Sequence, residues 1–200
     1  MLPLIVCSII SSAVVLERFW SLQRSKITPE SLLPLVWRWA KEGVLDTKRL
    51  DTIRKTSPLG RVLAAGLMCR DQDRLIMREA IEETGRHATF ELNKYLNTLG
   101  TIASISPLLG LLGTVVGMIK VFNAITTQGV GDPSILASGI SEALLTTAAG
   151  LCVAIPTLMF YRFFLGRVEG FVVHMEQEAL KLVEMAQRER LRLGASNLED

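Results

Sequence analysis

Two threonines and one glutamate stand out because they lie inside stretches of the sequence that are otherwise almost wholly apolar. Thr114 lies in the stretch 99–122, and Thr147 lies in the stretch 135–165, five residues after Glu142. A threonine hydroxyl can orient water or hydrogen-bond a carboxylate, but it does not take up and release protons near neutral pH. An ionisable residue in such a stretch is costly and by default functional. Together these residue types favour guidance of protons or ions rather than covalent catalysis.

Both threonines lie among small residues if the two stretches are helices, because residues three and four apart share a helix face. The face through Thr114 consists of Ala103, Pro107, Gly110, Thr114 and Gly117. The face through Thr147 consists of Gly139, Ala143, Thr147, Gly150 and Ala154. Small residues let helix backbones approach closely, and Gly113-x-x-x-Gly117 is itself a common packing pattern. Helix packing is therefore the alternative explanation, with each threonine hydroxyl bonded to its own backbone.

Three observations favour a role beyond packing. If the two helices cross a membrane in opposite directions, Thr114 lies about 22 Å and Thr147 about 18 Å from the start of its stretch. Both residues would then lie near the middle of the membrane. Pro107 on the same face cannot donate a backbone hydrogen bond and therefore frees a carbonyl. Glu142 lies about 7.5 Å from Thr147 along the helix. Its alternative role is a pairing with Lys120 or with the backbone, near the membrane interface on the outer side.

At the membrane depth of Thr114 and Thr147, this sequence has no carboxylate, histidine, lysine or arginine. Because a hydroxyl does not carry protons, any proton passing there needs an acceptor from another chain. The sequence therefore predicts a partner protein with an ionisable group at this depth. Glu142 is the candidate in this chain to assist that group.

The elements that hold these residues are three predicted membrane-spanning helices. The chain has 200 residues, of which 49% are hydrophobic, and its mean hydropathy of +0.34 is high for a soluble domain. We therefore expect an all-α integral membrane protein. Its segments are a transmembrane helix at 1–16, a helical cytoplasmic segment at 17–98, a second transmembrane helix at 99–122, a loop at 123–134, a third transmembrane helix at 135–165, and a cytoplasmic helix and tail at 166–200.

Two of these segments lead to further expectations. The stretch 1–16 would rise about 24 Å, which is short against a hydrocarbon core of about 30 Å, so we expect that a few N-terminal residues are missing. The charged stretches 74–98 and 167–190 are amphipathic, and no proline interrupts the first before Pro107. We expect both to extend the adjoining membrane helices without a break and to enclose a vestibule.

The distribution of positive charge predicts the orientation. The loop 123–134 contains no lysine or arginine, whereas the segments 17–98 and 166–200 carry nearly all of the 22 basic residues. Basic residues close to membrane helices stay on the cytoplasmic side. We therefore expect the loop and the N-terminus outside, and the C-terminus in the cytoplasm.

Composition and motifs argue against several other classes of protein. A net charge of +2 gives no basic field for nucleic acid. Cys7, Cys69 and Cys152 are odd in number and have no CxxC or Cys–His pattern, so we expect neither a disulfide framework nor a metal site. No nucleophile–base pair or phosphate-binding loop is recognisable. We therefore expect no enzymatic activity and no cofactor.

Two linked motifs carry a family resemblance. The stretches SPLLGLLGTVVGM at 106–118 and GISEALLTTAAGLCVAIP at 139–156 resemble the second and third spans of the ExbB/TolQ/MotA family of proton-channel motor proteins, and its ExbB branch most. The resemblance covers almost the whole chain. Three spans argue against the MotA branch, which normally has four. Thr146 departs from the pattern, because the family often has alanine there, and it places two hydroxyls side by side.

The resemblance implies a pentamer of this chain around a central pore, in a bacterial inner membrane, with the N-terminus in the periplasm. An ExbD-like single-span partner would carry a membrane aspartate inside the pore, and a TonB-like protein would transmit the energy of proton flow to outer-membrane transport. The implied proton-pathway and pore-lining residues are Thr114, Thr146, Thr147 and Glu142. The packing and kink positions are Pro107, Gly110, Gly113, Gly117, Gly139, Ala143 and Gly150.

Two other functions fit the same sequence. A TolQ-like subunit of the Tol–Pal envelope-maintenance system would share the motifs and the three spans. A passive helical membrane scaffold would use the small residues for packing alone. Variants that remove the Thr147 hydroxyl or the Glu142 carboxylate discriminate between a motor and a scaffold.

Overall fold

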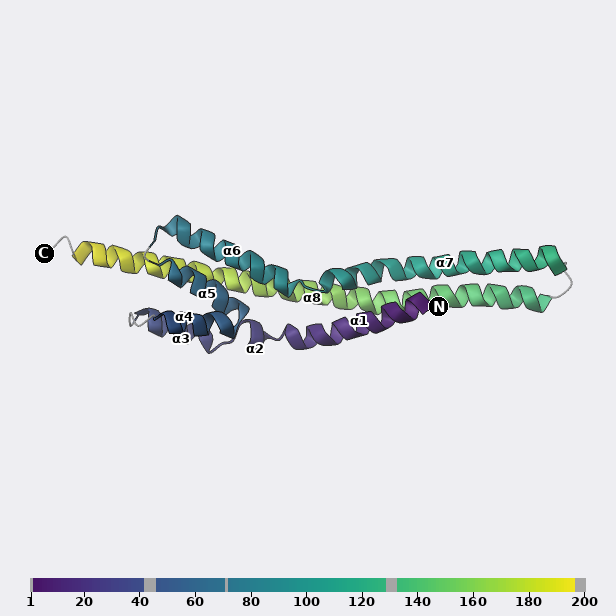
Figure 1. Cartoon of the computed structure of the whole chain (residues 1–200), viewed down its shortest axis with the longest axis horizontal. Coiled ribbons are helices and arrows are strands. Elements are labelled where there is room, and N and C mark those ends of the chain that lie inside the picture. The colour runs from purple at the N-terminus through teal and green to yellow at the C-terminus, as the bar shows by residue number, and fades with distance from the viewer. Residues whose placement is uncertain (1, 42–45, 71, 129–132, 197–200) are drawn as a thin grey trace. The chain divides into compact units, whose positions relative to one another are not determined.

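The computed structural model describes residues 2–41, 46–70, 72–128 and 133–196, and over these residues every regular element is a helix. The helices are α1 (Leu2–Ser21), α2 (Arg24–Ile27), α3 (Leu32–Lys41), α4 (Thr47–Thr56), α5 (Pro58–Met68), α6 (Arg74–Leu92), α7 (Leu96–Gln128) and α8 (Pro133–Ser196) (Figure 1). The all-α prediction is confirmed. The chain forms two compact units, Met1–Phe19 with Tyr95–Leu165, and Trp20–Lys94 with Gly166–Asp200.

Three helices are long and apolar enough to cross a membrane, as predicted. The candidate spans are Leu2–Ser21, Leu96–Thr127 and Ala137–Arg188. A hydrocarbon core needs about 20 helical residues. α7 has 33 residues and α8 has 64, so both are longer than a single crossing requires. The chain is a multi-pass membrane protein.

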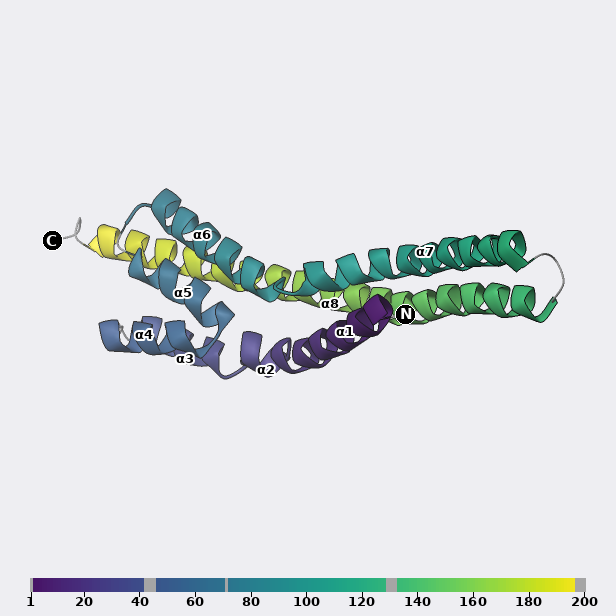
Figure 2. The same ribbon diagram turned by 45° about the vertical axis from the view of Figure 1, so that its right-hand side comes forward.

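In the first unit, α7 and the N-terminal part of α8 run antiparallel and side by side (Figures 1 and 2). α1 packs against α8 through an aromatic cluster. The ring of Phe19 lies 5.0 Å from that of Phe164, which is fully buried, and also contacts Phe160 and Phe163. The contacts with Phe160 and Phe164 are edge-on, which is a preferred geometry of aromatic pairs.

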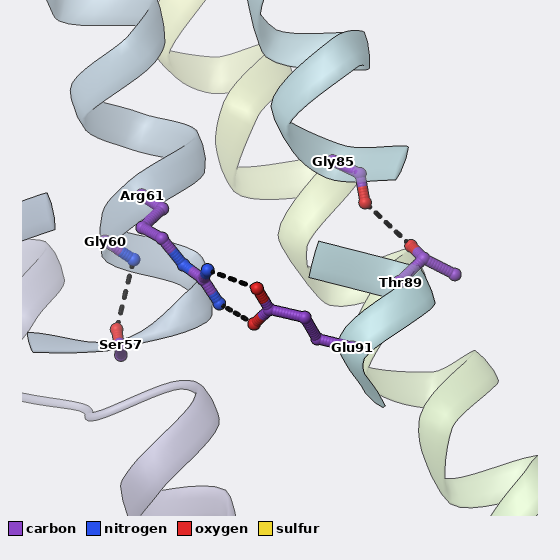
Figure 3. Close-up of polar contacts among 6 residues, drawn as sticks. All are labelled: Ser57, Gly60, Arg61, Gly85, Thr89 and Glu91. Atoms are coloured by element: carbon purple, nitrogen blue, oxygen red, sulfur yellow. Dashed lines mark hydrogen bonds and ion pairs between the residues drawn. The ribbon is translucent and has the colours of Figure 1, made fainter. Parts of the chain in front are cut away.

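In the second unit, local sequence signals define the short helices. Ser57 caps α5 because its hydroxyl accepts a hydrogen bond of 3.0 Å from the backbone of Gly60, and Pro58 occupies the first turn. Gly60 permits a close approach of α5 to α4, since a Cβ there would overlap the carbonyl oxygen of Ile53. Arg61 on α5 forms a bidentate ion pair with Glu91 on α6, in which both terminal guanidinium nitrogens donate to the carboxylate (Figure 3).

The core of the second unit is built by α5, α6 and the C-terminal part of α8. Its buried apolar side chains include Leu59, Val62, Leu63, Met77, Ile81, Ala88, Val168, Met175, Ala179 and Leu182. They recur at spacings of three and four residues on each helix, which is the expected pattern for helices that each bury one face.

Two details of the predicted helices are wrong. The helix expected to run unbroken from residue 74 into the second span ends at Leu92, and Asn93 is its C-cap. Tyr95 has a φ of 64°, a left-handed conformation that a right-handed helix excludes. The predicted loop 123–134 is also too long, because α7 continues to Gln128 and α8 begins at Pro133; residues 129–132 lie outside the described residues. α8 runs on through 167–190 without interruption, as expected.

Candidate functional site

Glycines set the close spacing of α7 and α8. A Cβ at Gly110 would lie 3.0 Å from the Cα of Thr147, and one at Gly117 would lie 2.8 Å from the Cβ of Ala143. The first distance is tighter than most side-chain contacts and the second is too short for a real one, so the backbones meet here because these residues are small. The two contacts also set the antiparallel register. Thr114 lies between them on α7, so Thr114 and Thr147 are at similar levels along the helix pair.

Further glycines extend this close contact in both directions. A Cβ at Gly150 would lie 2.7 Å from the carbonyl oxygen of Ser106, and one at Gly139 would overlap the side chain of Val121. All of the glycines from the predicted packing set therefore face the opposite helix. Ala143 is buried in the same interface.

At two positions of α7, the residue that faces α8 is the one before the residue that the sequence predicted. Ser106 is fully buried, whereas Pro107 beside it is half-buried. Gly113 lies directly against Thr146, whereas Thr114 is half-buried. On a helix a shift of one residue turns a side chain by about 100°. The hydroxyl of Thr114 is therefore not at the centre of the contact.

The same shift applies to α8. Thr146 is buried and donates a hydrogen bond of 2.6 Å to the carbonyl of Ala143 in its own helix. Thr147 is half-buried and donates a hydrogen bond of 3.1 Å to the carbonyl of Gly110, across to α7. Thr114 donates to Leu111 in its own helix, at 2.6 Å. Of the three hydroxyls, that of Thr147 is the one that links the two helices.

Glu142 lies away from the packed face. Its carboxylate is 3.6 Å from the ammonium group of Lys120 on α7, and both side chains are more than half exposed, at 61% and 63%. This is the ion pair that the sequence offered as the alternative role.

Three polar or kinking residues of this region were not singled out from the sequence. Ser106 and Thr157 are buried, and their hydroxyls bond the carbonyls of Ile102 and Val153 in their own helices. Pro156 lies inside α8, as Pro107 lies inside α7. Each proline lacks the N–H that would bond the carbonyl one turn earlier. The spacing of Ser106 from Gly110 is the signal that could have placed it on the stripe.

The chemistry that this arrangement allows is hydrogen bonding rather than proton storage. The protons of all three threonine hydroxyls are directed at backbone carbonyls, which leaves their oxygen lone pairs to accept hydrogen bonds from water or another group. No carboxylate, histidine, lysine or arginine occurs between Lys94 and Lys120 or between Glu142 and Arg162. Among the described residues, no cluster of three His, Cys, Asp or Glu could hold a metal ion.

Comparison with known proteins gives consistent results. Residues 54–177 match the MotA/TolQ/ExbB proton channel family. The chain is 35% identical over 165 residues to the putative biopolymer transport protein ExbB-like 1 of Synechocystis, covering 81% of this chain and 65% of that one. It is 30% identical over 149 residues to the putative biopolymer transport protein ExbB homolog of Methanothermobacter thermautotrophicus, covering 74% and 52%. It is 31% identical over 164 residues to the biopolymer transport protein exbB1 of Vibrio cholerae, covering 78% and 70%.

The chain thus spans about two thirds and about half of the lengths of the first two relatives. The family match includes α7 and the part of α8 that packs against it, where the threonines lie. It identifies a membrane channel component and not an enzyme, as expected from the sequence. The chain belongs to the MotA/TolQ/ExbB proton channel family, and the relatives named here carry ExbB names.

Proposed function

We propose that this chain is an ExbB-like subunit of a motor that uses the proton-motive force to energise TonB-dependent transport across the outer membrane. The observation that carries the proposal is the hydrogen bond from Thr147 to Gly110 within the glycine-lined contact of α7 and α8. It places a hydroxyl inside an apolar helix pair that the proton-channel family match covers. The ExbB names of the relatives favour this function over a TolQ-like one.

The proposed location is the bacterial inner membrane. The lack of lysine and arginine in 123–134 supports a periplasmic position for the connection between α7 and α8. With three spans, the N-terminus then lies in the periplasm and the C-terminus in the cytoplasm. The charged helices of the second unit would accordingly lie on the cytoplasmic side.

The proposed assembly is a homopentamer with α7 and the membrane part of α8 around a pore. An ExbD-like single-span protein would supply a membrane aspartate, and a TonB-like protein would transmit the motion. The absence of ionisable groups near Thr114 and Thr147 supports an acceptor from a partner. Thr114, Thr146, Thr147 and Glu142 would contribute to the path by offering hydrogen bonds to water and to that aspartate.

Uptake of a TonB-dependent substrate by cells carrying variants of this chain tests the proposal. Thr147→Val keeps the shape of the side chain but removes the hydroxyl, so energy-dependent uptake should be lost. Thr147→Ser restores a hydroxyl at the same position and should retain uptake. Assembly of each variant with its co-expressed partners is checked by co-purification. Full uptake by an assembled Thr147→Val variant would contradict the proposed proton path.

A further inference from the structure

The glycine-lined contact between α7 and α8 includes a tyrosine. A Cβ at Gly100 on α7 would lie 3.2 Å from the Cε2 atom and 3.3 Å from the Cζ atom of Tyr161 on α8. Tyr161 comes 14 residues after Thr147, about 21 Å along the helix and within about 40° of the same face. The ring of Tyr161 therefore packs in the same contact in which Thr147 lies.

The hydroxyl of Tyr161 differs from other hydroxyls of this contact in what it bonds. Those of Ser106, Thr146 and Thr157 are buried, and each donates to a carbonyl of its own helix. Tyr161 is half-buried, and its hydroxyl has no hydrogen-bond partner in the part of the chain that the structure describes. A phenol hydroxyl can both donate and accept. Both capacities of Tyr161 are therefore available to water.

The two prolines of this helix pair free backbone acceptors on the way to the tyrosine. Pro156 lacks the N–H that would bond the carbonyl of Cys152 in α8. Pro107 likewise lacks the N–H that would bond the carbonyl of Ala103 in α7. In the register of the two helices, both carbonyls lie between the level of Thr147 and that of the tyrosine. A carbonyl without its helical partner can be satisfied by an ordered water.

Tyr161 also lies at the end of the stretch without charged groups. No carboxylate, histidine, lysine or arginine occurs between Glu142 and Arg162, and Arg162 directly follows the tyrosine and is exposed. On α7, Thr101 and Ser104 are exposed within about one turn of the residue that the ring contacts. The side chain of Tyr161 is therefore at the boundary between the apolar helix pair and a polar surface.

We propose that the hydroxyl of Tyr161 relays protons between the path at Thr147 and the water at this end of the helix pair. The phenol oxygen takes a proton from a protonated water on one side as the phenol gives its own proton to a water on the other. The tyrosine is unchanged after each transfer. The inference rests on the proposed function, which places a proton path along α7 and α8 and this end in the cytoplasm. It adds a group that can donate as well as accept, which Thr147 cannot do while its proton is bonded to the carbonyl of Gly110.

The variant Tyr161→Phe tests the relay because it removes the hydroxyl and keeps the ring against Gly100. Since the hydroxyl has no partner among the described residues, the Tm of this variant in detergent should equal that of the unmodified protein. Tyr161→Ala, which removes the ring as well, should lower the Tm. The initial rate of energy-dependent uptake by cells with Tyr161→Phe should fall by roughly fivefold, as expected for losing one hydrogen bond on the path. Co-purification with the co-expressed partners checks assembly.

The matched control is Thr157→Val, one turn away on the same helix. It removes a buried hydroxyl that is already bonded to the carbonyl of Val153, so uptake should be unchanged. An equal loss of uptake in Thr157→Val and Tyr161→Phe would overturn the inference, as would a Tm of Tyr161→Phe as low as that of Tyr161→Ala. Full uptake by an assembled Tyr161→Phe variant, with uptake lost in Thr147→Val, would overturn the relay and leave the proposed function standing. Full uptake by both of these variants would contradict the proposed function as well.

Discussion

Gly113 on α7 lies directly against Thr146 on α8, and a Cβ added to Gly113 would be 2.6 Å from the Cβ of Thr146. Thr146 is buried in this contact, with its hydroxyl bonded to Ala143. The pair therefore fixes how closely the two helices approach. Because Thr147 reaches the carbonyl of Gly110 one turn away, the spacing set by Gly113 also determines whether that hydrogen bond can form.

Substitution of Gly113 by alanine should separate α7 from α8. The added methyl group cannot be accommodated without moving a helix, and overpacking of this kind costs about 1–3 kcal/mol. Gly170→Ala is the matched control, because a Cβ at Gly170 meets nothing within 4 Å and alanine favours a helix by up to about 1 kcal/mol. Thermal unfolding in detergent, followed by circular dichroism, should show a lower Tm for Gly113→Ala and not for Gly170→Ala. Equal changes in the two variants would contradict the assigned contact.

The sequence predicts the helix pair well but not which of two adjacent residues faces the partner helix. A stripe with spacings of three and four residues can be drawn through Pro107 and Thr114 or through Ser106 and Gly113. The two choices differ by one residue, which is about 100° around the helix. Only the packing against α8 decides between them, because Gly113 fits beside Thr146 and a threonine would not.

The break between α6 and α7 has one sequence signal, Asn93, because asparagine is a residue that can end a helix. Neither glycine nor proline occurs between Arg86 and Thr98, and the amphipathic pattern continues through this stretch. The chain nevertheless leaves the helix at Asn93, and Tyr95 adopts a left-handed conformation. The ring of Tyr95 is contacted by the guanidinium of Arg18, 5.4 Å from the ring centroid. A tertiary contact at Tyr95 thus accompanies a turn that local propensity does not favour.

Variants of Tyr95 should separate the contribution of its ring from the cost of its positive φ. Tyr95→Gly removes the ring but tolerates the positive φ, whereas Tyr95→Ala removes the ring and keeps a Cβ in the unfavourable conformation. The free energy of unfolding of the alanine variant should therefore be about 1 kcal/mol lower than that of the glycine variant. This is the reverse of their order inside a helix. Unfolding of the two variants in detergent gives this difference directly. A more stable alanine variant would argue against the left-handed conformation at this position.

The ion pair of Lys120 and Glu142 provides a test of whether the glutamate acts through pairing or by itself. Glu142→Lys combined with Lys120→Glu keeps two opposite charges at the same separation. If pairing is the sole role, the double variant should regain the uptake that each single variant loses. We expect it to remain inactive, because the proposed path needs a carboxylate on α8. Recovery of uptake in the double variant would assign Glu142 to pairing alone.

The pair of Arg61 and Glu91 should make the stability of the protein depend on pH. The hydrogen bond from Arg61 lowers the pKa of the Glu91 carboxyl below its ordinary value of 4.5, and the charge of Arg61 adds to this effect, whereas partial burial opposes it. The lowered pKa means that the native state favours the ionised form. The stabilisation is therefore fully present above about pH 4.5, the value of the unfolded chain, and is lost as the pH falls through the lower pKa of the folded protein.

Replacing Glu91 by glutamine removes this dependence. Because the pair is half exposed, the variant should lose only about 0.2–1 kcal/mol at pH 7. The difference from the unmodified protein should shrink as the pH is lowered and vanish once Glu91 is protonated in the folded state. Glu79→Gln is the control, since Glu79 is exposed on the same helix and has no ion-pair partner among the described residues. Denaturant unfolding of the three proteins between pH 3 and pH 7 measures the effect, and a constant difference between Glu91→Gln and the unmodified protein across that range would contradict the assigned role of Arg61.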